Sequence, residues 1–129
     1  MKFAIQVNTS PYESQISQIA LQFVKATLEE NHEIVRVFFY HEGIFNAFKH
    51  ATPLDDELNL TKEWSELAEL HKLDLVVCIS AGQRRGLLSS YESYRQNKTD
   101  DDLAKGFRIS GLGQWVEATL TADRFVVFG

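Results

Sequence analysis

Five short apolar segments alternate with segments of helical periodicity along this chain, and this order restricts the fold more than any other feature. The apolar segments are predicted strands, and they cover residues 2–7, 34–40, 74–79, 107–110 and 124–128. The second of them is almost entirely apolar, which is typical of a strand that helices cover on both faces. Strands that alternate with helices form right-handed βαβ units. The sequence therefore predicts an α/β fold, with a mostly parallel five-stranded sheet and helices on both of its faces.

The predicted helices each carry one stripe of apolar residues at spacings of three and four. These stripes run over residues 16–27, 60–71 and 115–119. Ser10, Pro11 and Glu13 indicate that the first helix starts there, because serine caps helices, proline fits the first turn and glutamate can reach back to the cap. Elsewhere the pattern is weak. Residues 44–57 are expected to be irregular, and residues 91–96 to form a helical turn.

Length and charge limit the class of protein. The chain has 129 residues, the size of one domain, so residues 1–129 are predicted to fold as a single unit. A net charge of −5 disfavours direct binding to nucleic acid, because the phosphates are also negative. No apolar stretch approaches the ~20 residues that span a bilayer, and the N-terminus is too short and too polar for a signal peptide. We therefore expect a cytoplasmic domain that contacts no membrane.

Cys78 is the only cysteine, and it lies at the end of the third predicted strand. Active sites of open α/β sheets form at the carboxyl ends of the strands. A helix that begins soon afterwards would place its positive end near the thiol and favour the reactive thiolate. Arg84 and Arg85 follow within a few residues and add positive charge. One interpretation is therefore that Cys78 is a catalytic nucleophile and that Arg84 and Arg85 stabilise its thiolate or bind the substrate. Paired arginines at a solvated helix end are the ordinary alternative.

A competing interpretation makes Cys78 a structural residue. Free cysteine is among the most buried residue types, and it packs as a small apolar side chain. In that case the chain would be a non-catalytic subunit that only supports the assembly of related chains. The rate at which Cys78 is alkylated in the native protein distinguishes the two interpretations.

Other chemical motifs are weak. His41 follows the second predicted strand, so it is either a base near Cys78 or an ordinary loop residue. The zinc pattern His-Glu-x-x-His fails because position 45 is Phe, and we predict no metal site. Residues 111–113 lack the third glycine of a dinucleotide loop, and residues 8–11 do not form a phosphate loop. A flavodoxin-like nucleotide binder is therefore disfavoured, and no cofactor is predicted.

Four segments together resemble the TusD/DsrE family of sulfurtransferase subunits: residues 37–47, 78–86, 109–118 and 123–128. The second segment is similar to the nucleophile segment of the family, with a cysteine followed by Arg-Arg-Gly at the same spacing. The likeness covers essentially the whole chain. It implies a DsrE-like fold in which Cys78 accepts a persulfide sulfur from a donor protein and passes it to a downstream carrier, without a cofactor.

The resemblance also implies a pathway and partners. The sulfur would end as the 2-thio group of a tRNA wobble uridine, or alternatively would enter dissimilatory sulfur oxidation. The chain would assemble with TusB- and TusC-like subunits, which lack the nucleophile, into a heterohexamer. The acceptor would dock on the loops around Cys78, including residues 42–48. In that segment Ile44, Phe45 and Phe48 either form the interface or cap the core.

Overall fold

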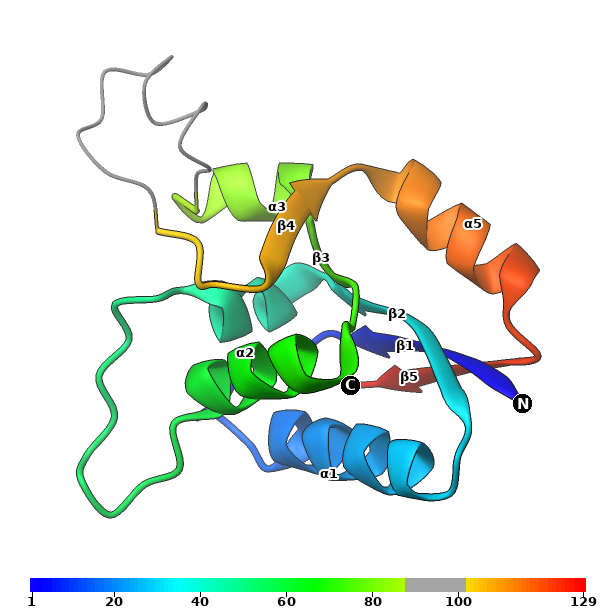
Figure 1. The fold of residues 1–129 in the computed structure, drawn as a ribbon. Coiled ribbons are helices and arrows are strands. Elements are labelled where there is room, and N and C mark those ends of the chain that lie inside the picture. Colours follow the sequence, from blue (N-terminus) through cyan, green and yellow to red (C-terminus); the bar gives the residue numbers. More distant parts are fainter. Residues whose placement is uncertain (88–101) are drawn as a thin grey trace.

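The computed structural model describes residues 1–87 and 102–129, which contain one five-stranded sheet (Figure 1). Its strands are β1 (Lys2–Val7), β2 (Glu33–Phe39), β3 (Leu75–Cys78), β4 (Phe107–Ser110) and β5 (Arg124–Phe128). They lie in the order β4-β3-β2-β1-β5, and every neighbouring pair is parallel. The predicted parallel α/β sheet is confirmed. The helical turn predicted at residues 91–96 lies outside the described residues.

Helices cover both faces of the sheet, as predicted. Figure 1 shows α1 (Ile16–Glu29) and α2 (Leu60–His71) on one face and α5 (Leu112–Thr121) on the other. Two further helices directly follow central strands, so they lie at the carboxyl edge of the sheet: the 3₁₀ helix η1 (His41–Ala47) after β2 and the short α3 (Ile79–Arg84) after β3. This edge is where active sites form in open α/β sheets.

Two predictions about the connections are wrong. The first helix begins at Ile16 rather than near Ser10, and its N-terminal residue Gln15 provides no side-chain cap. The hydroxyl of Ser17 donates to the Thr9 carbonyl at 2.7 Å, which ties the preceding segment down as a separate loop. Residues 44–57 are not all irregular, because η1 extends to Ala47.

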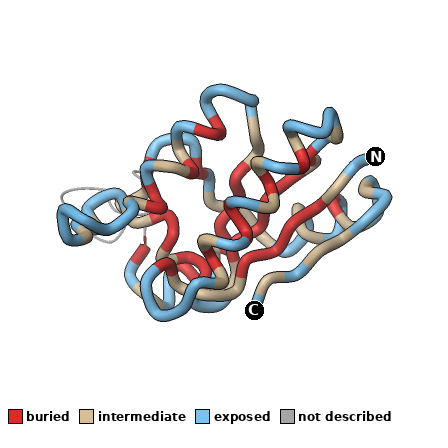
Figure 2. The backbone as a smooth tube through the Cα atoms, turned by 90° about the horizontal axis from the view of Figure 1, so that it is seen from below, coloured by how far each residue is buried: buried red, intermediate tan, exposed pale blue. Residues whose placement is uncertain are grey.

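The core lies mainly between the sheet and helices α1 and α2. Trp64 of α2 packs edge-on against Phe39, with ring centroids 5.3 Å apart, and both side chains are fully buried. Phe39 also contacts Phe107 of β4 at 5.2 Å, so the aromatic packing crosses three neighbouring strands. Figure 2 shows that buried residues follow the central strands and the inner sides of the helices. This packing holds β2 and β3 rigidly, and both strands lead into the carboxyl edge.

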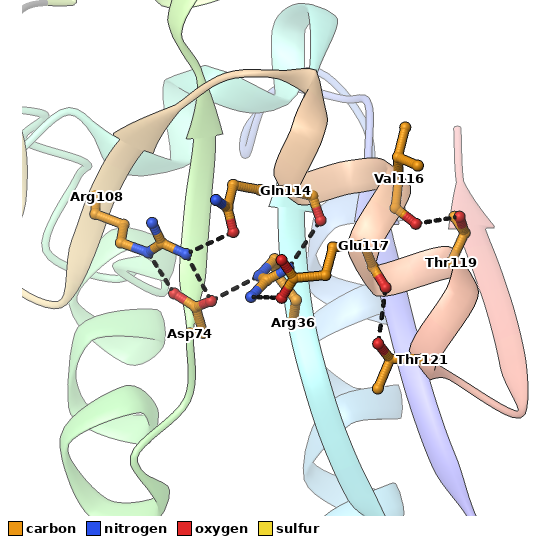
Figure 3. A network of polar contacts seen from close by, with 8 residues as sticks. All are labelled: Arg36, Asp74, Arg108, Gln114, Val116, Glu117, Thr119 and Thr121. Carbon is orange, nitrogen blue, oxygen red and sulfur yellow. Dashed lines mark hydrogen bonds and ion pairs between the residues drawn. The ribbon is translucent and has the colours of Figure 1, made fainter.

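The face under α5 depends on polar contacts. Arg36 of β2 donates to Asp74 at 2.6 Å and to the Gln114 carbonyl of α5 at 2.8 Å (Figure 3). Arg108 of β4 donates to both oxygens of Asp74, at 2.7 and 3.0 Å. Burial would raise the pKa of Asp74, but the hydrogen bonds from Arg108 and Arg36 outweigh it and hold that pKa below its ordinary value. Asp74, at the start of β3, therefore connects β2 and β4, and its two arginines extend the connection to α5.

Replacing Asp74 with asparagine is expected to lower the free energy of unfolding by about 2–3 kcal/mol near neutral pH, because the Arg36 side chain, only 10% exposed, loses most of its countercharge. The pKa of Asp74 is lower in the folded than in the unfolded chain, so its contribution is present above about pH 4 and is lost as the pH falls through the folded value. Urea denaturation at several pH values measures both effects.

The matched control is Glu66→Gln, which removes an exposed ion pair with Lys62 whose side chains are 60% and 70% exposed. We expect a change of less than about 0.5 kcal/mol there, because exposed helix pairs contribute little. If the free energy of unfolding differs between wild type and Asp74→Asn by the same amount from pH 7 to pH 3, the charge of Asp74 does not hold the network together.

Candidate active site

Cys78 ends β3 and is also the residue that immediately precedes α3. Its backbone is extended, with φ −62° and ψ 122°, and it lies opposite Ser110 of β4 in the parallel register. The helix begins at the next residue, so the amides of its first turn, which have no partner within the helix, follow Cys78 directly, although the thiol makes no capping hydrogen bond to them. The side chain is buried, and only 2% of the residue is exposed in the isolated chain. The structure therefore places the thiol at a helix start on the carboxyl edge, but beneath the surface.

Arg85 forms an ion pair instead of facing the thiol. Its Nε and Nη2 both donate to Oε1 of Glu42 at 2.9 and 2.7 Å, and its Nη1 donates to the Ala81 carbonyl at 3.0 Å. Arg84 is exposed. Within residues 1–87 and 102–129, neither arginine forms a hydrogen bond with Cys78. Their role in binding a substrate stays a prediction, and the structure adds Glu42, which sequence reasoning did not single out.

The Arg85–Glu42 pair connects α3 to η1, and η1 is firmly held. A Cβ atom on Gly43 would lie 1.9 Å from the Val7 carbonyl oxygen, so the backbone of η1 rests directly on the end of β1. The buried side-chain amide of Asn46 donates to the carbonyls of Thr9 and Gly43 at 3.1 and 2.9 Å. Through Glu42, this fixed segment limits the movement of α3, which directly follows the buried Cys78.

Replacing Glu42 with glutamine is expected to speed the alkylation of Cys78 in the native protein about fivefold. The pair is partly exposed, at 57% for Glu42 and 24% for Arg85, so it contributes about 1 kcal/mol to keeping α3 closed, a factor of about five in the open population. High salt should speed alkylation of the wild type in the same way and should hardly affect the variant. An unchanged rate in Glu42→Gln would show that the pair does not restrain α3.

The apolar residues after β2 divide between the two predicted roles. Ile44 is fully buried and caps the core. Phe45 and Phe48 are half-buried, and their rings stack with centroids 5.2 Å apart. Together with Pro11 and Tyr12 they line a pocket of about 500 Å³. The expectation of an interface in this segment therefore concerns Phe45 and Phe48 and does not extend to Ile44.

His41 has the properties of a loop residue. It is exposed, its φ of 50° is left-handed, and its ring stacks on Tyr40 with centroids 4.1 Å apart. Among the described residues it makes no hydrogen bond with Cys78. The geometry gives no support to the interpretation of His41 as a base for Cys78.

Neither a metal centre nor a membrane span is found in the part of the chain that the structure describes. There, no group of three or more His, Cys, Asp or Glu side chains is placed to hold a metal ion. None of the described helices is long and apolar enough to cross a membrane.

Comparisons with known proteins identify relatives that match this chain over its whole length. A protein named DsrE from Allochromatium vinosum is 52% identical over 129 residues, covering 100% of this chain and 99% of its own length. Sulfurtransferase TusD from Salmonella arizonae is 41% identical over 128 residues, which cover 99% of this chain and 100% of the Salmonella protein. A TusD homologue from Vibrio vulnificus is also 41% identical.

A solved structure and a family model also match this chain. The crystal structure of the YchN protein from E. coli covers 99% of both chains with a TM-score of 0.80, and at 21% identity it shows the fold alone. The sequence model of the DsrE/DsrF-like family matches residues 1–128 of this chain. The chain therefore belongs to the DsrE/DsrF-like family.

Proposed function

We propose that this chain is a sulfurtransferase subunit of a sulfur relay, and that Cys78 carries the sulfur as a persulfide. Full-length relatives at 41% identity are named sulfurtransferases, which supports the class of activity. The position of the only thiol, at the carboxyl edge of the sheet and at the start of α3, is the observation that carries the assignment to Cys78. A donor and an acceptor protein are the partners that this chemistry needs.

The transfer needs only thiol exchange. The Cys78 thiolate attacks the outer sulfur of a donor persulfide, the S–S bond of the donor breaks, and the donor leaves as a thiolate. Cys78 then carries the outer sulfur. An acceptor thiolate attacks that sulfur next, and the S–S bond on Cys78 breaks to regenerate its thiolate. No external oxidant or reductant enters either step. The free amides in the first turn of α3 can donate hydrogen bonds to the anionic sulfur and stabilise it.

The burial of Cys78 means that the reaction requires a local opening. α3 has only six residues, and the Arg85–Glu42 ion pair is exposed enough for water to replace it. Short elements with few buried contacts open at much lower cost than the whole domain. The same burial is the observation that favours the second candidate function, a non-catalytic assembly subunit with an inert Cys78.

Intact mass spectrometry tests the assignment. After incubation with glutathione persulfide, the protein should gain the mass of one sulfur atom, and peptide mapping should place it on Cys78. Iodoacetamide should alkylate the native protein slowly but measurably, at a rate set by local opening. No added sulfur, together with alkylation only after global unfolding, would instead support the assembly subunit.

The destination of the sulfur and the assembly are the finer parts of the proposal. In a TusD-type role the chain assembles with TusB- and TusC-like subunits as a heterohexamer, and the sulfur reaches a tRNA wobble uridine. The 52% identity to DsrE, against 41% to TusD proteins, favours the alternative of sulfur oxidation. Deleting the gene distinguishes them: loss of 2-thiouridine from tRNA indicates the first destination, and loss of sulfur oxidation with intact tRNA thiolation indicates the second.

A further inference from the structure

We propose that the pocket beside η1 binds an arginine side chain of a partner protein. The pocket has a volume of about 500 Å³, within the range of ordinary ligand sites. It lies between the loop after β1 and the segment after β2, both of which follow the carboxyl ends of their strands. It is therefore on the same edge of the sheet as Cys78.

The walls of the pocket are apolar and preformed. Phe45 and Phe48 form one stacked wall, and the buried Pro11 and the ring of Tyr12 form part of another. The Tyr12 hydroxyl donates to the Leu58 carbonyl at 3.1 Å, which fixes that ring. Gly43 and Asn46 fix η1 against β1, as described above. A partner side chain would thus meet rigid aromatic surfaces, with little entropy to lose on the receiving side.

Two carboxylates give the pocket its charge preference. Glu13 is exposed and makes no hydrogen bond or ion pair with any described residue. Glu42 accepts hydrogen bonds from Nε and Nη2 of Arg85 on its Oε1, and its Oε2 has no hydrogen-bond partner among the described residues. A neutral apolar side chain would leave Glu13 without a countercharge, and an acidic one would be repelled by it.

An arginine side chain fits both features at once. Its aliphatic stem packs on apolar surface while its charged end stays near water. Its planar guanidinium stacks on aromatic rings and pairs with carboxylates, which a lysine ammonium does less well. The net charge of −5 also attracts a basic partner. Since Glu42 lines this pocket and also pairs with Arg85 at the end of α3, a partner docked here is held close to the helix that begins directly after Cys78.

The binding itself does not depend on sulfur transfer; only the assignment of the partner to a relay rests on the proposed function. The probe is the dipeptide acetyl-Phe-Arg-amide, titrated into the full chain and followed by backbone amide resonances in NMR. We expect saturable shifts at Glu13, Glu42, Phe45 and Phe48. The matched probe has citrulline in place of arginine, which keeps the shape without the charge, and we expect it to bind at least tenfold more weakly.

Variants of the protein complete the test. Glu13→Gln should weaken binding of the arginine dipeptide severalfold without affecting the fold, because Glu13 is exposed and has no described partner. Glu30→Gln, at the far end of α1, is the matched control and should leave binding unchanged. Equal binding of the citrulline probe, or shifts confined to residues outside the pocket, would overturn the proposal. The same titration on Cys78→Ser tests binding in a protein without the thiol. If this variant binds the dipeptide while the wild type takes up no sulfur, the relay is rejected and the pocket proposal stands.

Discussion

Replacing Gly43 with alanine is expected to lower the free energy of unfolding by about 3 kcal/mol or more, the largest effect on stability that we foresee for a single methyl group. The added Cβ would lie 1.9 Å from the Val7 carbonyl oxygen and 2.8 Å from its carbon. Both atoms belong to the backbone of β1, which pairs with strands on each side. That oxygen also accepts a hydrogen bond from the Tyr40 amide at 3.0 Å, so relieving the overlap breaks the junction between β1, β2 and η1.

Gly113→Ala is the matched control. An added Cβ there meets nothing within 4 Å, and the residue lies in α5, where alanine is the better helix former. We expect no loss, and a gain of up to about 1 kcal/mol. Urea denaturation followed by circular dichroism measures both variants. If Gly43→Ala proves as stable as Gly113→Ala, then η1 can move away from β1 at little cost, and the rigidity assumed for the pocket and for the Arg85–Glu42 pair is absent.

The strands were predictable because their signals are local. Alternating apolar residues predict the first strand at residues 2–7, and it is observed at Lys2–Val7, since this alternation is a property of a few neighbouring residues. η1 was not predicted. Gly43 lies close to Val7, and this contact between distant segments leaves no local signal in the sequence. The start of α1 was misplaced for a similar reason, because Ser17 binds the loop that the sequence assigned to the helix.

The site was predicted in part. The end of an apolar strand was enough to place Cys78 at the carboxyl edge, and the structure shows that α3 starts immediately after it. The pairing of Arg85 with Glu42 joins residues 43 positions apart, and that of Arg36 with Asp74 joins residues 38 apart. Such pairs depend on strand order and register, which residue spacing does not encode. Sequence reasoning therefore identified the arginines but not the partner that holds Arg85 away from the thiol.

Replacing Cys78 with serine is expected to abolish sulfur uptake completely. The chain has no other cysteine, and only a thiolate can attack the donor persulfide and keep the sulfur as a persulfide. The substitution should preserve the fold. Serine is nearly the size of cysteine and is a preferred residue at the position before a helix, where its hydroxyl can accept a hydrogen bond from an amide in the first turn of α3. Such a bond would satisfy the hydroxyl despite its burial.

Uptake is measured with radiolabelled glutathione persulfide, followed by separation of the protein from small molecules under non-reducing conditions. Ser80→Ala, an exposed change in the first turn of α3, is the control and should take up sulfur like the wild type. Label that stays on Cys78→Ser would mean that sulfur binds without a thiol, and the relay mechanism would fail. If Cys78→Ser takes up no sulfur but has the circular dichroism spectrum of the wild type, the loss is due to the missing thiol and not to unfolding. The subunit would then be intact, and only the sulfur carrier would be gone.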